Sequence, residues 1–370
     1  MKKLKILIVS DPYGKPSFAP RLRYLCNYLV AQGHQIAVYT EQFQQHDFPH
    51  AYPIIEKPLS YHHTWQWACQ SLWSLLTDWR NRRFSMWLQQ QVADQLFDMV
   101  FCTTFSTFPL RAAQEIARAK QIPLIVDIRD LDEQVPGAQY QGHRQWWARP
   151  FSRWYKQVNI RRRNHVLRLA DTVTTISPWH VEFIQQFNPN VHLIYNGYDP
   201  SQFYAEDIPM DTFYISYIGR IYEFQSTALV EQAVRELNLP HVEFNIHTPD
   251  CRPIPLSAVG DELRRSSMAL VLTNPNAKGM MTTKFFEALG CEKPILCTPS
   301  DNGLLTKTIR DTNAGLASSD IDEIKAFMLD KYHEWQQNGF TRQAVINKEQ
   351  FSRQQQAQQF EQLFMQCSKR

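Results

Sequence analysis

The feature that most constrains the fold is the alternation of short apolar runs with helical patterns. The run Leu4–Val9 is followed by residues 22–29, where apolar side chains recur at i, i+3, i+4 and i+7. Gly33 ends this helical pattern, and Ile36–Thr40 is the next apolar run. A strand, a helix and a strand in this order predict a βαβ unit with parallel strands and a right-handed crossover.

The same alternation continues in two blocks. In the first block, further strands are expected at Asp98–Cys102, Leu124–Ile128, Thr172–Ile176 and Val191–Tyr195. In the second block they are expected at Phe213–Ile218, Val242–His247, Ala269–Leu272 and Pro294–Thr298. A turn cluster at Asn196–Pro200 separates the blocks. We therefore expect an α/β protein with two doubly wound, Rossmann-like domains, residues 1–197 and 198–345, followed by a Gln-rich amphipathic helix at 346–370.

Composition excludes several classes of protein. Apolar residues make up 44% of the 370 residues and charged residues 20%, which is ordinary for a chain that buries a core. The net charge of +3 is too small to indicate a nucleic-acid partner. The seven cysteines are scattered and form no C-x-x-C pair, so neither a zinc site nor a disulfide framework is indicated. With no long apolar segment and no signal-peptide pattern, we expect a cytoplasmic protein.

The strongest functional signal is the segment Thr282–Gly290. Thr282 or Thr283 suits the N-cap of a helix, which places Lys284 in the first turn, where backbone N–H groups and the helix dipole favour phosphate. Glu287 follows one turn later on the same face. The pattern fits a nucleotide with its diphosphate at the helix start and its ribose hydroxyls on Glu287. An exposed Lys–Glu pair on a solvated helix is the simpler alternative.

A second cation lies in the same predicted domain. Gly219 and Arg220 follow directly on the expected strand Phe213–Ile218, at the carboxyl end where open α/β sheets bind ligands. The guanidinium offers a fork of donors that matches phosphate oxygens. Arg220 and Lys284 could therefore converge on one diphosphate.

Together with other segments of the chain, these features resemble the retaining GT-B glycosyltransferases that use nucleotide sugars, of the group 1 or family 4-like kind. Five segments in order carry the resemblance and span most of residues 4–316. They are Arg21-x-x-x-Leu25-x-x-x-Leu29 with Gly33-His34; Asp127-Ile128-Arg129-Asp130; Thr175-Ile176-Ser177 with Asn196-Gly197-Tyr198-Asp199; Gly219-Arg220; and Lys284-Phe285-Phe286-Glu287 with Lys293-Pro294-Ile295.

The resemblance implies two domains facing a cleft. Residues 198–345 would bind the donor, a UDP- or GDP-linked sugar, residues 1–197 would bind the acceptor, and the terminal helix would cross back onto the first domain. Arg220 and Lys284 would stabilise the leaving diphosphate, supported by Thr282 and Thr283, while Glu287 would bind the ribose. No metal and no cofactor beyond the nucleotide sugar would be needed, because cationic side chains do this work.

On the acceptor side the resemblance points to Gly14, Arg21, Arg129 and Asp130. We expect Asp130 to bind or polarise a hydroxyl of the acceptor or the sugar, which makes it the third catalytic candidate. A carboxylate that pairs with Arg129 or caps a helix is the alternative for Asp130. The triplets Asp130-Leu131-Asp132 and Asp320-Ile321-Asp322 read D-x-D, but such triplets arise readily by chance and we expect no metal there.

Two departures from the family pattern keep other functions open. Gln225 stands where a Lys is frequent, and Gly279 stands where a Glu is frequent eight residues before the ribose-binding one. A catalytically degenerate partner subunit that binds lipid is therefore one alternative. A nucleotide-sugar epimerase is another, although no convincing pair of acid and base carboxylates is visible. A dinucleotide-dependent oxidoreductase is disfavoured because no G-x-G-x-x-G follows the first strand of either domain.

The segment 134–170 is basic and aromatic, with no Asp or Glu. Its charged residues are Arg144, Arg149, Arg153, Lys156, Arg161, Arg162, Arg163 and Arg168, interleaved with Trp146, Trp147, Phe151, Trp154 and Tyr155. This combination is typical of a segment on an anionic membrane surface. A helix that packs its aromatic side on a sheet, or a single-stranded nucleic-acid site, would give a similar pattern; the pocket for a nucleotide and the near-neutral charge disfavour nucleic acid.

The sequence thus predicts an enzyme that transfers a sugar, with retention, from a nucleotide sugar to a lipid-linked or polysaccharide acceptor. Its expected role is cell-envelope glycan synthesis, in the cytoplasm or peripherally on the inner face of the plasma membrane.

Overall fold

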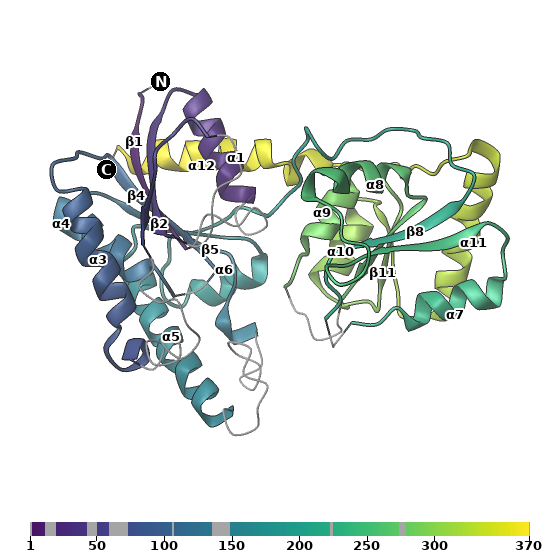
Figure 1. The fold of residues 1–370 in the computed structure, drawn as a ribbon, viewed down its shortest axis with the longest axis horizontal. Coiled ribbons are helices and arrows are strands. Elements are labelled where there is room, and N and C mark those ends of the chain that lie inside the picture. Colours follow the sequence, from purple (N-terminus) through teal and green to yellow (C-terminus); the bar gives the residue numbers. More distant parts are fainter. Residues whose placement is uncertain are drawn as a thin grey trace. The chain divides into compact units, whose positions relative to one another are not determined.

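A computed structural model describes residues 2–11, 20–42, 50–58, 73–105, 107–134, 149–222, 225–273 and 279–369 (Figure 1). The chain divides into two compact units. The first comprises Met1–Tyr195 together with Ala357–Arg370, and the second comprises Asn196–Gln356. The first boundary lies two residues before the expected position of 197, and the last fourteen residues belong to the first unit.

The described strands of the first unit form a seven-stranded parallel sheet in the order β3-β2-β1-β4-β5-β6-β7. The strands are β1 Lys5–Ser10, β2 Gln35–Glu41, β3 Ile54–Lys57, β4 Met99–Thr104, β5 Leu124–Ile128, β6 Thr172–Thr175 and β7 Val191–Leu193. The helices are α1 Pro20–Ala31, α3 Trp79–Gln91, α4 Leu110–Lys120, α5 Arg149–Leu169, α6 Pro178–Ile184 and α12 Arg353–Cys367, with a short 3₁₀ turn, η1, at Asp132–Gln134.

Both faces of this sheet are covered, which is why its central strands β1, β4 and β5 are mostly apolar. Alternate residues of β1 point to opposite faces, so Leu7 and Val9 join a cluster with α3, α4 and α5. Ile6 and Ile8 join a second cluster with α1 and α12. Figure 1 shows α12, in yellow, beside α1 on the sheet.

The end of α12 is part of the first unit's core. The rings of Phe360 and Phe364 lie 5.4 and 5.1 Å from the ring of Phe101 on β4. Glu361 lies 3.0 Å from the Nε2 atom of His34 and accepts a 2.8 Å hydrogen bond from the Tyr28 hydroxyl. These contacts join the carboxyl end of the chain to α1 and to the start of β2.

The described strands of the second unit form a five-stranded parallel sheet in the order β12-β11-β10-β8-β9. The strands are β8 Phe213–Ile218, β9 Val242–His247, β10 Met268–Leu272, β11 Ile295–Thr298 and β12 Gly315–Ala317. The helices are α7 Ala228–Leu237, α8 Val259–Arg265, α9 Thr283–Gly290, α10 Leu304–Asp311 and α11 Ile321–Asn338, with 3₁₀ turns η4 at Leu256–Ala258 and η5 at Lys348–Phe351.

The prediction of two parallel, Rossmann-like α/β domains is confirmed. The strand order reverses between β1 and β4 in the first sheet and between β8 and β10 in the second. The carboxyl ends of strands at such a reversal form the crevice where ligands bind in open α/β sheets. Each unit therefore has one edge at which to search for a site.

Candidate functional site

Lys284 lies at the strand-order reversal of the second unit. Thr282 is the N-cap of α9, since its Oγ1 atom accepts a hydrogen bond of 3.4 Å from the backbone N–H of Phe285. Lys284 is then the second residue of the helix. Its Nζ atom lies 5.2 Å from the centroid of the Tyr217 ring on β8. The helix start and the strand end expected from the sequence thus come together.

The close approach of the Lys284 side chain to the end of β8 requires a glycine at position 219. Its φ of +132° is one that L side chains rarely adopt, and a Cβ atom there would lie 2.5 Å from Cε and 2.9 Å from Nζ of Lys284. The Lys284 side chain therefore passes directly over the end of β8. Burial lowers the pKa of Lys284, and the nearby Glu287 carboxyl opposes that shift.

Arg220 follows Gly219 and is exposed. Its backbone carbonyl accepts a 2.7 Å hydrogen bond from the hydroxyl of the buried Tyr217, which fixes the chain where it leaves β8. Within the residues that the structure describes, no carboxylate forms an ion pair with the Arg220 guanidinium. Its charge is available to an anion at the same strand end as Lys284.

Glu287 lies on the partly buried side of α9. Burial raises the pKa of its carboxyl to about 7, and the positive charges of Arg353 and Lys284 act against the rise. Thr283, the first residue of α9, is exposed. Thr282, Thr283, Lys284 and Glu287 thus occupy the first turn and a half of one helix, with Thr282 engaged as its cap.

The two departures from the family pattern have structural explanations. The side chain of Gln225 donates a 2.7 Å hydrogen bond to the carbonyl of Leu272 and accepts one of 3.0 Å from the N–H of Tyr222. It therefore ties the segment after β8 to the end of β10. Gly279 has a φ of +72°, which a glutamate would adopt only with strain. Gln225 thus supports the backbone at these strand ends, and Gly279 supplies a backbone conformation that suits glycine.

The reversal of the first sheet holds an ion pair that the sequence did not predict. Asp11, directly after β1, is 2% exposed, and both of its carboxylate oxygens lie 3.2 Å from Nη2 of Arg129. Its Oδ2 also accepts hydrogen bonds from the N–H of Phe105 at 3.1 Å and the hydroxyl of Thr104 at 3.3 Å. Burial raises the pKa of Asp11, while Arg129 and these donors lower it. The one signal in the sequence was its place after a strand.

The other predicted acceptor-side residues differ in their surroundings. Asp130 is exposed beside Arg129, whose hydrogen bonds go to Asp11. Gly14 lies outside the described residues. Arg21 is buried: its Nη2 atom lies 3.2 Å from Oδ1 of Asp127 and donates a 2.9 Å hydrogen bond to the carbonyl of Ile194. These contacts hold Arg21 within its own unit, and its place on the acceptor side stays a prediction.

No cluster of three or more His, Cys, Asp or Glu side chains able to hold a metal ion occurs in the described part of the chain. The second D-x-D triplet has a structural role. Asp320 is the N-cap of α11 and accepts hydrogen bonds from the N–H groups of Asp322 and Glu323 at 2.8 and 3.1 Å.

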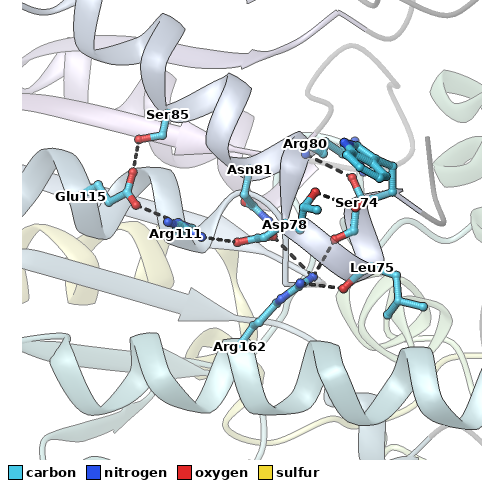
Figure 2. Close-up of polar contacts among 11 residues, drawn as sticks. Ser74, Leu75, Asp78, Arg80, Asn81, Ser85, Arg111, Glu115 and Arg162 are labelled. Carbon is cyan, nitrogen blue, oxygen red and sulfur yellow. Dashed lines mark hydrogen bonds and ion pairs between the residues drawn. The ribbon is translucent and has the colours of Figure 1, made fainter.

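The basic segment lies partly in α5, while residues 135–148, including Trp146 and Trp147, are outside the described ranges. Two of its arginines face inward. Arg163 is 1% exposed and donates a 2.8 Å hydrogen bond to Glu133. Arg162 donates to the carbonyls of Ser74 and Leu75 at 3.0 and 2.8 Å and lies 3.5 Å from Asp78 (Figure 2).

Figure 2 shows that the Asp78 carboxylate also accepts hydrogen bonds from Arg111 of α4 and Asn81 of α3. Their lengths are 3.0 and 2.9 Å. This network joins α3, α4 and α5. The outer side of α5 carries Arg153, Trp154, Arg161, His165 and Arg168, all of them exposed. No helix within the described residues is long and apolar enough to span a membrane.

Comparison with known proteins places these sites in context. Residues 20–202 match the model of Glycosyltransferase Family 4. Among curated proteins, no sequence matches the chain.

Several solved structures share the fold over nearly the whole chain. Sucrose-phosphate synthase from Thermosynechococcus elongatus is 16% identical with a TM-score of 0.66, covering 98% of this chain and 99% of that one. HepE of Anabaena, solved in complex with UDP-glucose, is 14% identical with a TM-score of 0.63 and coverage of 98% and 100%. The lipopolysaccharide outer core galactosyltransferase WaaB is 12% identical with a TM-score of 0.57 and coverage of 98% and 99%. The family match and this shared fold together support a glycosyltransferase.

Proposed function

We propose that the protein transfers a sugar from a nucleotide sugar to an acceptor hydroxyl, with retention of configuration. The observation that carries this proposal is Lys284, which the start of α9 holds over Gly219 at the end of β8. In the reaction, the bond from the anomeric carbon to the diphosphate oxygen breaks and a bond to the acceptor oxygen forms. The proton of the acceptor hydroxyl passes to the departing nucleoside diphosphate and from there to water. Retention rests on the resemblance of the five sequence segments to the retaining enzymes.

The second unit supplies the chemistry for the leaving group. Arg220 and Lys284 at one strand end would balance the negative charge that develops on the diphosphate, and preorganised donors of this kind are usually the largest catalytic contribution. Glu287 would accept hydrogen bonds from the ribose hydroxyls. We propose that these side chains replace a metal ion and that no other cofactor takes part. HepE binds UDP-glucose, so a UDP-linked sugar is the first donor to test, before GDP-linked ones.

The test is thermal unfolding with UDP-, GDP-, CMP- and dTDP-linked sugars in the absence of added metal. A ligand at 100 times its dissociation constant stabilises the folded protein by about 2.7 kcal/mol, a shift of at least a few degrees for a chain of this size. Arg220→Ala should abolish the shift, whereas Arg235→Ala, at an exposed position of α7, should keep it. No shift with any nucleotide would contradict the donor assignment and favour the alternative of a degenerate partner subunit.

We further propose a lipid-linked or polysaccharide acceptor of the cell envelope, reached on the inner face of the plasma membrane. The support is the exposed side of α5, where Arg153, Arg161 and Arg168 accompany Trp154, which is 45% exposed. Each basic residue near an anionic bilayer contributes about 1 kcal/mol. Asp130, exposed at the carboxyl end of β5, is the candidate to orient the acceptor hydroxyl. The WaaB neighbour is named for a lipopolysaccharide substrate.

Sedimentation with anionic vesicles tests the membrane part separately. The double variant Arg153→Glu and Arg161→Glu should weaken binding about tenfold or more. The matched double variant Arg235→Glu and Lys307→Glu reverses two exposed charges of the second unit and should bind like the wild type. Equal losses in both variants would mean that net charge alone, and not the outer side of α5, governs the attraction.

A further inference from the structure

Arg353 occupies an unusual place for a cation. It is the first residue of α12 and is 9% exposed. Its Nε atom donates a 3.1 Å hydrogen bond to the carbonyl of Gly197, and its backbone N–H donates one of 2.8 Å to the carbonyl of Tyr198. Residues 197–198 and 351–353 belong to the two stretches where the chain enters and leaves the second unit. Arg353 therefore fastens these stretches together.

Helix α9 packs on both of these stretches, through Phe351 of one and Tyr198 of the other. The ring of Phe351 lies 6.2 Å from that of Phe285 and 5.6 Å from that of Phe286. At Gly290, a Cβ atom would lie 2.7 Å from the Tyr198 ring, so glycine lets the helix approach closely. These contacts fix α9 against the segment that holds Arg353. Glu287 lies one turn before Gly290 on the same side of α9, so its carboxyl faces the stretch that holds Arg353, whose charge acts on it.

We propose that Arg353 is a positioning residue for nucleotide binding: it keeps the Glu287 carboxylate ionised and ready to accept hydrogen bonds from the ribose hydroxyls of the donor. This inference rests on the proposed function, because it assigns the ribose to Glu287. It adds a residue that lies outside every sequence segment used to identify the site.

The electrostatic surroundings of Glu287 leave Arg353 with a distinct role. Burial favours the protonated carboxyl, and Arg353 is the first cause and Lys284 the second that oppose it. The packed strands β10 and β11 offer only one titratable side chain, the thiol of Cys297, whose pKa burial raises. Cys291, directly after α9, is likewise held as a thiol by burial, which raises its pKa to about 12.

The charged residues of η5 act elsewhere. Lys348 donates a 2.6 Å hydrogen bond to Glu292, and the charge of Glu349 acts on Tyr198. A bound diphosphate would also draw the Lys284 charge toward itself. Arg353 is then the cation left to keep Glu287 ionised in the complex.

The experiment is calorimetric titration of UDP into the full-length protein between pH 6 and pH 9. With Glu287 titrating near pH 7, wild-type affinity should fall on acidification. In Arg353→Gln the fall should begin at higher pH. For a shift of one pKa unit, UDP binds about fivefold more weakly at pH 7 and almost normally at pH 9. Arg353→Lys, which keeps the charge, should retain the wild-type profile, and so should the exposed control Arg235→Gln.

The double variant Glu287→Gln/Arg353→Gln identifies the route of the effect. In a Glu287→Gln background, loss of Arg353 should change neither the UDP affinity nor its pH profile. A uniform loss of affinity at every pH in Arg353→Gln, with Arg353→Lys equally impaired, would overturn the proposal and assign Arg353 a purely structural role. If Arg353→Gln does not fold cooperatively, the profile of Arg353→Lys alone makes the same distinction.

A second readout separates this inference from the proposed function. Carbon NMR of protein labelled at the glutamate carboxyls, assigned by Glu287→Gln, reports the Glu287 pKa without a ligand. A higher Glu287 pKa in Arg353→Gln supports the inference even if the wild type binds no UDP, in which case the donor assignment fails alone. An unchanged Glu287 pKa overturns the inference while leaving UDP binding by the wild type intact.

Discussion

The two units present cations at the same place in their sheets but treat them differently. In the first unit, the Arg129 guanidinium beyond β5 is held by both carboxylate oxygens of Asp11 beyond β1. In the second unit, Arg220 and Lys284 meet no carboxylate oxygen within 4 Å among the described residues, and Lys284 lies against an aromatic ring. The cation at one strand-order reversal is thus neutralised by a carboxylate of the same unit, while those at the other keep an unpaired positive charge among the described residues.

Under the proposed function, this difference separates cations that are balanced within the fold from cations that are balanced by a ligand. A buried ion pair contributes little net stability, but removing one partner costs about 3–5 kcal/mol because a charge is left uncompensated. Under the proposed function, the charge of an unneutralised cation at a strand end is compensated by the substrate. The composition of the chain does not reveal this distinction, since both kinds of residue look alike in a list of Lys and Arg.

The largest expected effect follows from breaking the pair of the first unit. Asp11→Ala should lower the free energy of unfolding by about 3–5 kcal/mol, because Arg129 would lose its buried counter-charge. Asp130→Ala changes a neighbouring but exposed carboxylate and should stay within about 0.5 kcal/mol of the wild type. Urea unfolding followed by circular dichroism measures both. Equal losses in the two variants would mean that the buried pair of Asp11 and Arg129 matters no more to stability than an exposed carboxylate does.

The next effect is the pH dependence that His180 of the first unit contributes to stability. His180 is 2% exposed, with Nδ1 3.0 Å from the Thr175 hydroxyl and Nε2 3.0 Å from Oε1 of Gln134. Burial, with the Arg163 charge second, lowers its pKa to about 4, against the partial opposition of Glu133. The folded protein thus binds this proton less readily than the unfolded chain does. The His180 contribution to stability is therefore full above pH 6.5 and falls as the pH drops toward 4, by up to about 1.4 kcal/mol per unit, while Glu287, whose pKa is raised to about 7, contributes in the opposite sense.

Urea unfolding at pH 7, 6, 5 and 4.5 measures this slope. His180→Gln should flatten it, whereas His333→Gln, at an exposed position of α11, should leave it as in the wild type. A wild-type slope that persists in His180→Gln would place the acid sensitivity in other groups.

Much of the fold could be predicted because its signals are local. The strands β1, β8, β10 and β11 are short apolar runs of the kind that a sheet covered on both faces requires. β3 and β12 escaped prediction, because at the sheet edges they are partly exposed and read Ile-Ile-Glu-Lys and Gly-Leu-Ala. The α9 cap and the Gly219–Arg220 strand end were visible for the same local reason.

The remainder depended on contacts between distant parts of the chain. Arg21 and Arg129 looked alike in the sequence. Arg21 pairs with Asp127, 106 positions away, and Arg129 pairs with Asp11, 118 positions away. Arg353 meets Gly197 across 156 positions. No periodicity or motif encodes which carboxylate or carbonyl closes such a pair. The sequence therefore indicated the strand ends at which these cations lie, but not which of them are paired with a carboxylate.

In the second unit, the test that corresponds to Asp11→Ala is removal of the Lys284 charge. Lys284→Met keeps the length of the side chain and removes its charge. It should weaken UDP binding by about 1.5–3 kcal/mol, a factor of roughly 10 to 150, which is the range for a hydrogen bond to a charged group. Isothermal titration calorimetry measures the affinity, and Lys307→Met on α10 is the matched exposed control.

The free energy of unfolding should not fall in Lys284→Met as it is expected to fall in Asp11→Ala of the first unit. Because Lys284 is desolvated without a paired carboxylate, Lys284→Met should leave the free energy of unfolding equal to or above that of the wild type. A loss of several kcal/mol, like that expected for Asp11→Ala, would show that Lys284 serves the fold and would undo the division between the two strand ends.

The smallest expected effect concerns the helix that presents Lys284. Thr282→Ala removes the oxygen that accepts the hydrogen bond from the Phe285 N–H, and loss of such an N-cap typically costs about 1 kcal/mol. Thr282→Ser keeps a hydroxyl and should restore most of that energy. Because a frayed first turn no longer holds Lys284 over Gly219, UDP affinity should fall in the alanine variant and recover in the serine variant. Equal affinity in both would mean that contacts of the Lys284 side chain with β8, and not the helix cap, hold the cation in place.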